Sequence, residues 1–379
     1  MDTEITVPDL LAKLDRGEPV FLLDVRNADE FAAWRFEGKR PAESMNIPYF
    51  EFIEEPEAAL ARVPHPNFEI AVICAKGGSS EFVAELLRES GVPARSLMDG
   101  MRAYGSHLEP VQVTPETAST SELWQMNRRG KGCLSYILRS GNEAIVVDPS
   151  RHTQTYLDFV AGLNAHITRV LDTHVHADHL SGGPELATTL GIPYYAAAGP
   201  GISMEQTVAA LKNGDLLSLG DKKNVVQVLS TPGHTPGSTS YLVHNQYLLS
   251  GDTLFVNGIG RPDLGGEVEA WARTLFNTLT QCIAHLPEHV IVMPAHYSAT
   301  SEIGPGGIVS VRLGDLKAKA PELRMRSEQA FVDTMVAAMQ KPPAAYSDII
   351  RVNLGLAQTE DEQATEWELG KNKCAAARH

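Results

Sequence analysis

The sequence is short of cysteine and has no long apolar run. Its 379 residues include only four cysteines, all far apart, which excludes a disulfide-stapled scaffold and suits a reducing compartment. No stretch of about 18 apolar residues occurs, so we expect no membrane-spanning helix. The first residues are acidic and lack the basic and apolar regions of a secretory signal, so a cytoplasmic location is expected.

Positive charge is also scarce. Lysine and arginine number 32 against 47 aspartates and glutamates, which gives a formal net charge of −15. This balance argues against a nucleic acid or an anionic membrane as the partner. We expect a small-molecule substrate and a homo-oligomeric assembly. The length favours two domains over one.

Histidine is concentrated in one stretch of the chain. Three of the 13 histidines and an aspartate fall within residues 174–179, between a strand-like run at 167–171 and a Gly-Gly turn. The candidate ligands there are His174, His176, Asp178 and His179. Neutral imidazole and carboxylate suit zinc, iron or manganese. A polar surface loop is the simpler alternative, but so dense a cluster favours a metal site.

Three further candidate ligands follow short apolar runs. His234 stands between two Pro-Gly turns, Asp252 follows the run 247–249, and His296 follows the run 290–292. Loops at the ends of strands are common places for functional groups. The ordered set resembles the metallo-β-lactamase superfold over about residues 121–300, and this resemblance implies an αββα sandwich.

The N-terminal part of the chain shows a different pattern. Residues 20–24 and 70–74 are continuous apolar runs of the kind found in buried parallel strands, and helical spacing follows each of them. Strands alternating with helices predict a parallel α/β domain over residues 1–110. Cys74 ends the second run, where loop N–H groups and a helix dipole favour a thiolate. A buried, inert cysteine is the alternative.

Three segments of this α/β domain resemble a single rhodanese domain: residues 24–26, the loop 74–80 and the ending 99–104. The resemblance implies that Cys74 carries sulfur as a persulfide. The rest of the expected loop is Lys76, Gly77, Gly78, Ser79 and Ser80. Many rhodanese loops have an arginine where Ser79 stands, so a preference for thiosulfate is not implied, and Lys76 is expected to supply the charge. Asp24 and Arg26 are expected to form a structural ion pair.

Three later segments narrow the resemblance. Residues 258–264 look like the persulfide dioxygenase branch of the superfold, and residues 341–346 and 350–353 are similar to an extension of proteins that join such a domain to rhodanese modules. We therefore expect a metallo-β-lactamase-fold domain over 121–300 and its C-terminal extension over 301–379, with a frayed polar tail from residue 358. The polar residues 110–122 are the expected linker.

The resemblance implies that a low-molecular-weight persulfide, such as glutathione persulfide, is oxidised by O₂ to sulfite, with sulfur transfer at Cys74. It further implies one Fe(II) per chain, held by His174, His234 and Asp252. Two histidines and one carboxylate leave coordination positions open on a redox-active metal. Zinc has no redox chemistry and would not activate O₂.

The remaining candidates leave two further functions open. His176, Asp178, His179 and His296 are expected to orient the three ligands. They could instead complete a site for two Zn(II) ions bridged by Asp252, as in a thioester hydrolase of the hydroxyacylglutathione type. A persulfide carrier with a structural metal is a third, non-enzymatic hypothesis. The sequence does not decide whether Cys133 lies at the site or packs in the core.

Overall fold

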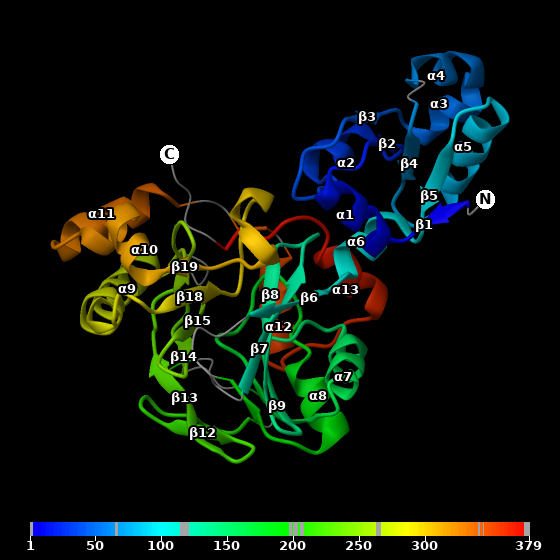
Figure 1. Ribbon diagram of the computed structural model, residues 1–379. Coiled ribbons are helices and arrows are strands. Elements are labelled where there is room, and N and C mark those ends of the chain that lie inside the picture. Colours follow the sequence, from blue (N-terminus) through cyan, green and yellow to red (C-terminus); the bar gives the residue numbers. More distant parts are fainter. Residues whose placement is uncertain are drawn as a thin grey trace. The chain divides into compact units, whose positions relative to one another are not determined.

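The computed structural model describes residues 3–64, 67–113, 121–196, 199, 204, 208–262, 267–339, 342–343 and 345–374, apart from the side chains of residues 222–224. The chain forms two compact units (Figure 1). The first comprises residues 1–109, 128–131 and 369–371, and the second comprises residues 110–127, 132–368 and 372–379. The predicted linker 110–122 is wrong at both ends, because residues 110–113 and 121–122 lie in strands. Its residues 114–120 lie outside the described residues.

The first unit is built on a five-stranded parallel sheet in the order β1-β5-β4-β2-β3. Its strands are β1 (Glu4–Ile5), β2 (Val20–Asp24), β3 (Ser44–Asn46), β4 (Glu69–Ile73) and β5 (Ala94–Leu97). Its helices are α1 (Val7–Arg16), α2 (Ala28–Ala33), α3 (Tyr49–Glu54), α4 (Pro56–Arg62), α5 (Gly78–Glu89) and α6 (Gly100–Ser106). This architecture confirms the predicted α/β domain.

Alternate residues of β2 and β4 serve opposite faces of this sheet. Phe21 and Val72 belong to the core under helices α3, α4 and α5, whereas Leu22 and Ala71 belong to the core under α1 and α6. Both strands are therefore apolar almost throughout, as a strand covered on both sides must be. Their carboxyl ends share one edge of the sheet, where Cys74 follows β4.

The second unit contains two six-stranded sheets, ordered β11-β10-β9-β8-β7-β6 and β12-β13-β14-β15-β18-β19. The first sheet consists of β6 (Glu109–Val113), β7 (Ser121–Arg128), β8 (Cys133–Ser140), β9 (Glu143–Val147), β10 (His166–Leu171) and β11 (Tyr194–Tyr195). The second sheet consists of β12 (Leu216–Leu219), β13 (Lys222–Ser230), β14 (Thr239–Val243), β15 (Tyr247–Gly251), β18 (Ile291–Pro294) and β19 (Val311–Arg312). A small hairpin joins β16 (Leu254–Phe255) and β17 (Gly258–Ile259).

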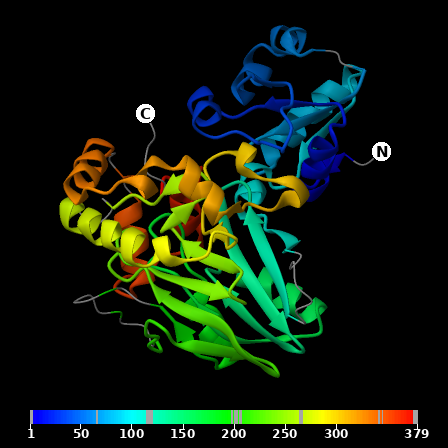
Figure 2. The same cartoon turned by 60° about the vertical axis from the view of Figure 1, so that its left-hand side comes forward.

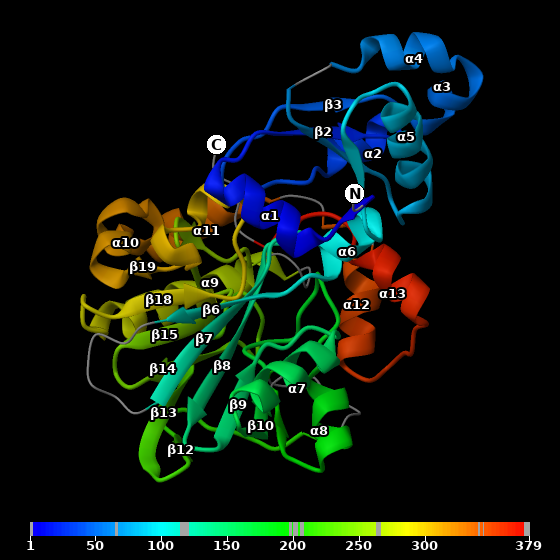
Figure 3. The same ribbon diagram turned by 45° about the vertical axis from the view of Figure 1, so that its right-hand side comes forward.

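The two sheets pack face to face (Figure 2). Tyr136 and Leu171 of one sheet share a buried core with Tyr241 and Met293 of the other. Helices α7 (Thr153–Gly162) and α8 (Gly183–Leu190) lie against β10, as Figure 3 shows. Helices α9 (Val268–Gln281), α10 (Leu313–Lys319) and α11 (Glu328–Ala337) cover the second sheet. Short 3₁₀ helices span Ile283–His285, Thr300–Glu302, Pro305–Gly307 and Pro321–Arg324. The αββα prediction is confirmed.

The expected frayed tail is wrong for residues 358–374. The C-terminal extension forms α12 (Tyr346–Asn353) and α13 (Asp361–Trp367), and Ala364 and Cys374 are buried. Hydrogen bonds of polar side chains hold this segment in place. Its sequence therefore has few apolar positions that would signal the packing. Residues 375–379 lie outside the described residues. In the described parts of the chain, no helix is long and apolar enough to cross a membrane.

Candidate metal centre and sulfur-transfer loop

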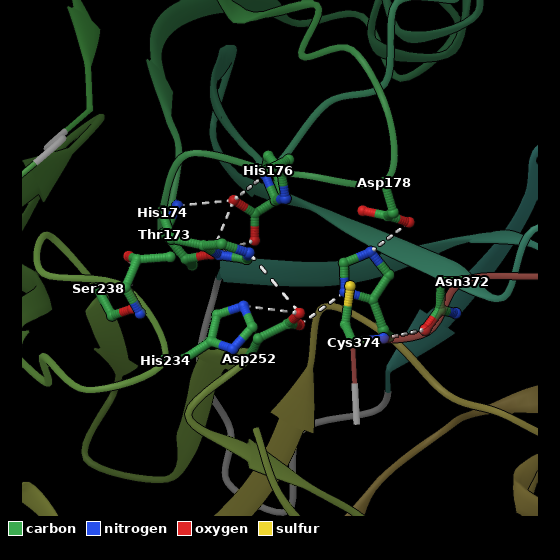
Figure 4. A network of polar contacts seen from close by, with 12 residues as sticks. Thr173, His174, His176, Asp178, His234, Ser238, Asp252, Asn372 and Cys374 are labelled. Atoms are coloured by element: carbon green, nitrogen blue, oxygen red, sulfur yellow. Dashed lines mark hydrogen bonds and ion pairs between the residues drawn. The ribbon is translucent and has the colours of Figure 1, made fainter. Parts of the chain in front are cut away.

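Each predicted metal ligand follows a strand of the second unit. β10 precedes the loop 174–179, and β13, β15 and β18 precede His234, Asp252 and His296, respectively. The structure brings all seven predicted side chains together, and none is more than 2% exposed. Figure 4 shows five of them, namely His174, His176, Asp178, His234 and Asp252. A cluster of buried polar groups needs partners, so the pairing of each nitrogen and oxygen decides what the site can bind.

Three of these side chains direct a metal-ligating atom without a hydrogen-bond partner toward one point. Nε2 of His174 and Nε2 of His234 lie 3.7 and 3.4 Å from Oδ2 of Asp252. The three atoms lie within 4.8 Å of one another, and none has a hydrogen-bond partner among the described residues. Leaving three such atoms buried and unpaired is costly, and a metal ion would satisfy all of them. The residues therefore fit a single metal ion.

Hydrogen bonds behind the rings fix which nitrogen faces that point. Nδ1 of His234 lies 2.7 Å from the carbonyl oxygen of Arg261, which only accepts, so Nδ1 carries the proton and Nε2 keeps its lone pair. Nδ1 of His174 lies 2.9 Å from Oγ1 of Thr173. That hydroxyl donates to Asp148, at 2.9 and 3.0 Å from its two carboxylate oxygens, and so accepts from His174. Both rings are thus oriented to ligate through Nε2.

Most atoms of the other candidates pair with one another, although Nε2 of His296 and Nδ1 of His176 form no hydrogen bond among the described residues. His296 lies between two carboxylates, with Nδ1 2.6 Å from Oδ1 of Asp252 and Nε2 3.2 Å from Oδ2 of Asp178. Nδ1 of His179 lies 3.0 Å from Oδ1 of Asp178. Donor atoms of Cys133, Asp178, His179 and His296 also lie within 4.8 Å of one another, so this second set could hold a metal after its internal pairs are broken.

Electrostatics separates the two sets of histidines. Burial lowers the pKa of His174 well below its ordinary value and also lowers the pKa of His234. Burial opposes charge on His179 and His296 too, but Asp178 outweighs it. The carboxylate raises the pKa of His179 to about 10 and that of His296 well above its ordinary value. Near neutral pH, the rings of His174 and His234 are therefore neutral and suited to a metal, whereas the rings of His179 and His296 are charged.

Comparison with known proteins agrees with this fold. Residues 128–296 match the model of the metallo-beta-lactamase superfamily, and residues 6–107 match that of the rhodanese-like domain. A hydroxyacylglutathione hydrolase of Actinobacillus pleuropneumoniae serotype 5b is 32% identical over 211 residues, which cover 55% of this chain and 85% of that protein. The chain belongs to the metallo-β-lactamase superfamily. It carries an N-terminal rhodanese-like domain, as its sequence predicts.

Within the superfamily, the chain is also similar to persulfide dioxygenases. The mitochondrial persulfide dioxygenase ETHE1 of Bos taurus is 29% identical over 171 residues, covering 44% of this chain and 65% of that protein. The crystal structure of ETHE1 from Myxococcus xanthus superposes with a TM-score of 0.53 and 26% identity, covering 62% of this chain and 98% of that one. Hydrolases and dioxygenases are thus similar to the chain at comparable identity.

Asp148 is a residue of the metallo-β-lactamase site that sequence reasoning missed. Its carboxylate accepts hydrogen bonds from the backbone nitrogen of Thr173 at 2.7 Å, and its Oδ1 lies 3.2 Å from Nε2 of His176. Nδ1 of His176 has no hydrogen-bond partner among the described residues. Asp148 follows the apolar strand β9 and precedes a proline, and this Asp-Pro pair at a strand end was the available signal.

Two cysteines reach the metallo-β-lactamase site. Sγ of Cys133 lies 3.3 Å from Oδ2 of Asp178, so the structure places this thiol at the site. The sulfur of Cys374 lies with donor atoms of Asp252 and His296, all within 4.8 Å of one another (Figure 4). Burial raises the pKa of the Cys374 thiol well above its ordinary value. The polar composition of the tail gave no sign of this position.

The rhodanese-like loop surrounds the sulfur of Cys74. The backbone nitrogen of Gly77 donates to Sγ at 3.0 Å, and Oγ of Ser80 lies 3.1 Å from it. Lys76 and Gly78 are exposed, Ser79 is half-buried, and α5 begins at Gly78. Of the predicted loop residues, the structure thus places Gly77 and Ser80 in contact with this thiol.

The predicted pair of Asp24 and Arg26 lies in the core of the rhodanese-like domain. Nη2 of Arg26 lies 2.7 Å from Oδ2 of Asp24 and also donates to the carbonyl oxygen of Trp34. Both side chains are buried, and their hydrogen bonds tie the end of β2 to the segment after α2. This pairing fits a structural role and leaves no free charge for catalysis.

Proposed function

We propose that this protein oxidises a low-molecular-weight persulfide with O₂ to give sulfite and thiol, and that its rhodanese-like domain transfers sulfane sulfur through Cys74. The balanced reaction is RSSH + O₂ + H₂O → RSH + SO₃²⁻ + 2H⁺. The observation that carries the proposal is that His174, His234 and Asp252 direct three ligand atoms without hydrogen-bond partners toward one point, whereas His179 and His296 form hydrogen bonds with Asp178 and Asp252.

The three unpaired ligand atoms would hold one Fe(II), which would supply the redox chemistry for the reaction of the persulfide with O₂. Thr173 and Arg261 keep the two imidazoles aimed at that point. The raised pKa values of His179 and His296 keep both rings charged near neutral pH, where they would favour an anionic persulfide. The buried surroundings exclude water from the reacting sulfur.

In the rhodanese-like domain, the thiolate of Cys74 would attack the outer sulfur of a persulfide. The S–S bond of the donor breaks, the donor leaves as a thiol, and Cys74 becomes a cysteine persulfide. The N–H of Gly77 lies where it can stabilise the negative sulfur. We keep a small thiol-bearing substrate without nucleic acid, a cytoplasmic location and a homo-oligomer as predictions.

A thioester hydrolase with two metal ions is the second candidate. It is favoured by the additional donor set of Cys133, Asp178, His179 and His296 and by the likeness to hydroxyacylglutathione hydrolase. Zinc lacks the redox chemistry that the oxidation needs, so the metal separates the two functions.

One protein sample tests both functions. Protein purified without added metal is analysed for iron and zinc, and sulfite formation and O₂ uptake under air are compared with thioester cleavage under argon. We expect about one iron per chain and O₂ uptake matched to persulfide loss, in line with a facial triad of ligands. Two zinc ions per chain and no O₂ uptake, even after anaerobic reconstitution with Fe(II), would overturn the proposal in favour of the hydrolase.

A further inference from the structure

The loop that carries four of the predicted ligands is held by one side chain of the C-terminal extension. Nδ2 of Asn353 donates to the carbonyl oxygens of His176 at 2.8 Å and His179 at 2.9 Å. Oδ1 of Asn353 accepts from the backbone nitrogen of Ser181 at 3.0 Å. A carboxamide offers two donor hydrogens and one acceptor oxygen. Asn353, at the end of α12, uses all of these groups on a single loop.

The backbone of the loop depends on partners outside it. Residues 174–180 lie in no helix or strand, so their backbone polar groups depend on partners from elsewhere. Oε1 of Glu368 accepts from the backbone nitrogen of Leu180 at 2.9 Å, and Leu180 packs with Ile349 of α12. Asn353 is 6% exposed. Water therefore does not compete for its hydrogen bonds, and each bond constrains the loop.

We propose that Asn353 is a positioning residue of the metal centre. It brackets Asp178 by its bonds to the residues on either side, and Asp178 holds His296, which in turn holds Oδ1 of Asp252. The carboxamide thereby sets the direction of the Asp252 carboxylate and of the loop imidazoles. This inference rests on the proposed function only in that the site binds a metal, and it does not depend on the reaction.

Metal affinity and ligand geometry test this role without an activity assay. Co(II) is titrated into the full-length chain after chelation, and its visible absorption bands report both the Kd and the coordination geometry. Asn353→Ala removes the three hydrogen bonds. Asn353→Asp keeps the acceptor for Ser181 and removes the two donors. Met335→Ala is the matched control, because it shortens a buried side chain of α11 in the core between this helix and the second sheet of the same unit.

We expect both Asn353 variants to raise the Kd for Co(II) tenfold or more and to change the bands, as loss of an outer hydrogen-bond partner does at other metal sites. Met335→Ala should lower the thermal midpoint and leave Kd and bands as in the wild type. Folded Asn353 variants with wild-type Kd and bands would overturn the proposal. So would equal weakening by Met335→Ala, or failure of both Asn353 variants to fold, since Asn353 would then serve folding alone. A wild-type chain that binds no Co(II) would instead contradict the proposed function.

Discussion

Nδ1 of His296 lies 2.6 Å from Oδ1 of Asp252, whereas Oδ2 of the same carboxylate has no hydrogen-bond partner among the described residues. The two oxygens of the Asp252 carboxylate therefore have different surroundings. The first is held by a ring whose pKa is raised well above its ordinary value, and the second faces His174 and His234. This asymmetry favours one metal on the Oδ2 side and a cationic imidazole on the Oδ1 side.

Removing one histidine from each set should separate a one-metal site from a two-metal site. His234→Ala removes an unpaired donor, so the iron content should fall from about one per chain to nearly none. His179→Ala removes only a paired ring, so the chain should keep about one iron while O₂ uptake falls. Elemental analysis of both variants checks this prediction. Loss of half the metal in each variant would indicate two ions that share the site.

The sequence predicts the ligands of this site because each one follows a strand. The periodic apolar runs place the strands, and ligands at strand ends then lie on neighbouring loops. The tight turns between β8 and β9 and between β14 and β15 also have a local signal in the sequence: Gly141 has φ of 61°, and His244 and Asn245 have φ of 52° and 54°, values that glycine and asparagine tolerate well.

The partners around the ligands were not predictable in the same way. Asn353 contacts a loop about 175 positions earlier in the chain, and Cys374 reaches Asp252 from a segment whose composition is polar. Such contacts depend on the three-dimensional path of the extension and leave no periodic pattern in the sequence. The choice between iron and zinc is equally invisible, because both metals accept imidazole and carboxylate.

The boundary between the domains can be tested by limited proteolysis. The first cut is expected between residues 109 and 122, a polar range that includes β6 and ends at the start of β7. The N-terminal fragment should then contain the rhodanese-like domain, and mass spectrometry of the early products locates the cut. A first cut within the region 132–296 would contradict this boundary.

Cys74→Ser should abolish sulfur transfer and leave persulfide oxidation largely intact. A serine hydroxyl is not nucleophilic toward sulfane sulfur, although the N–H of Gly77 and the hydroxyl of Ser80 would still surround it. Transfer from glutathione persulfide to cyanide and O₂ uptake are measured on the same sample. Cys282→Ser is the matched control, because that thiol is half-buried at the end of α9 and should affect neither assay. Wild-type transfer by Cys74→Ser would remove Cys74 from the mechanism.

The pairing of His179 with Asp178 predicts how the stability of the metal-free protein depends on pH. The pKa of His179 is raised from 6.5 to about 10 in the folded chain, and that of His296 is raised in the same direction. A raised pKa in the folded state means that the pair of His179 and Asp178 stabilises the folded chain fully below about pH 6.5. This stabilisation is lost as the pH rises toward 10. The thermal midpoint of chelated protein should therefore fall over that interval. Asp178→Asn should flatten the fall, because it removes the carboxylate that raises both pKa values, whereas Asp333→Asn on the exposed side of α11 should leave it unchanged. An equally steep fall in Asp178→Asn would show that other groups cause it.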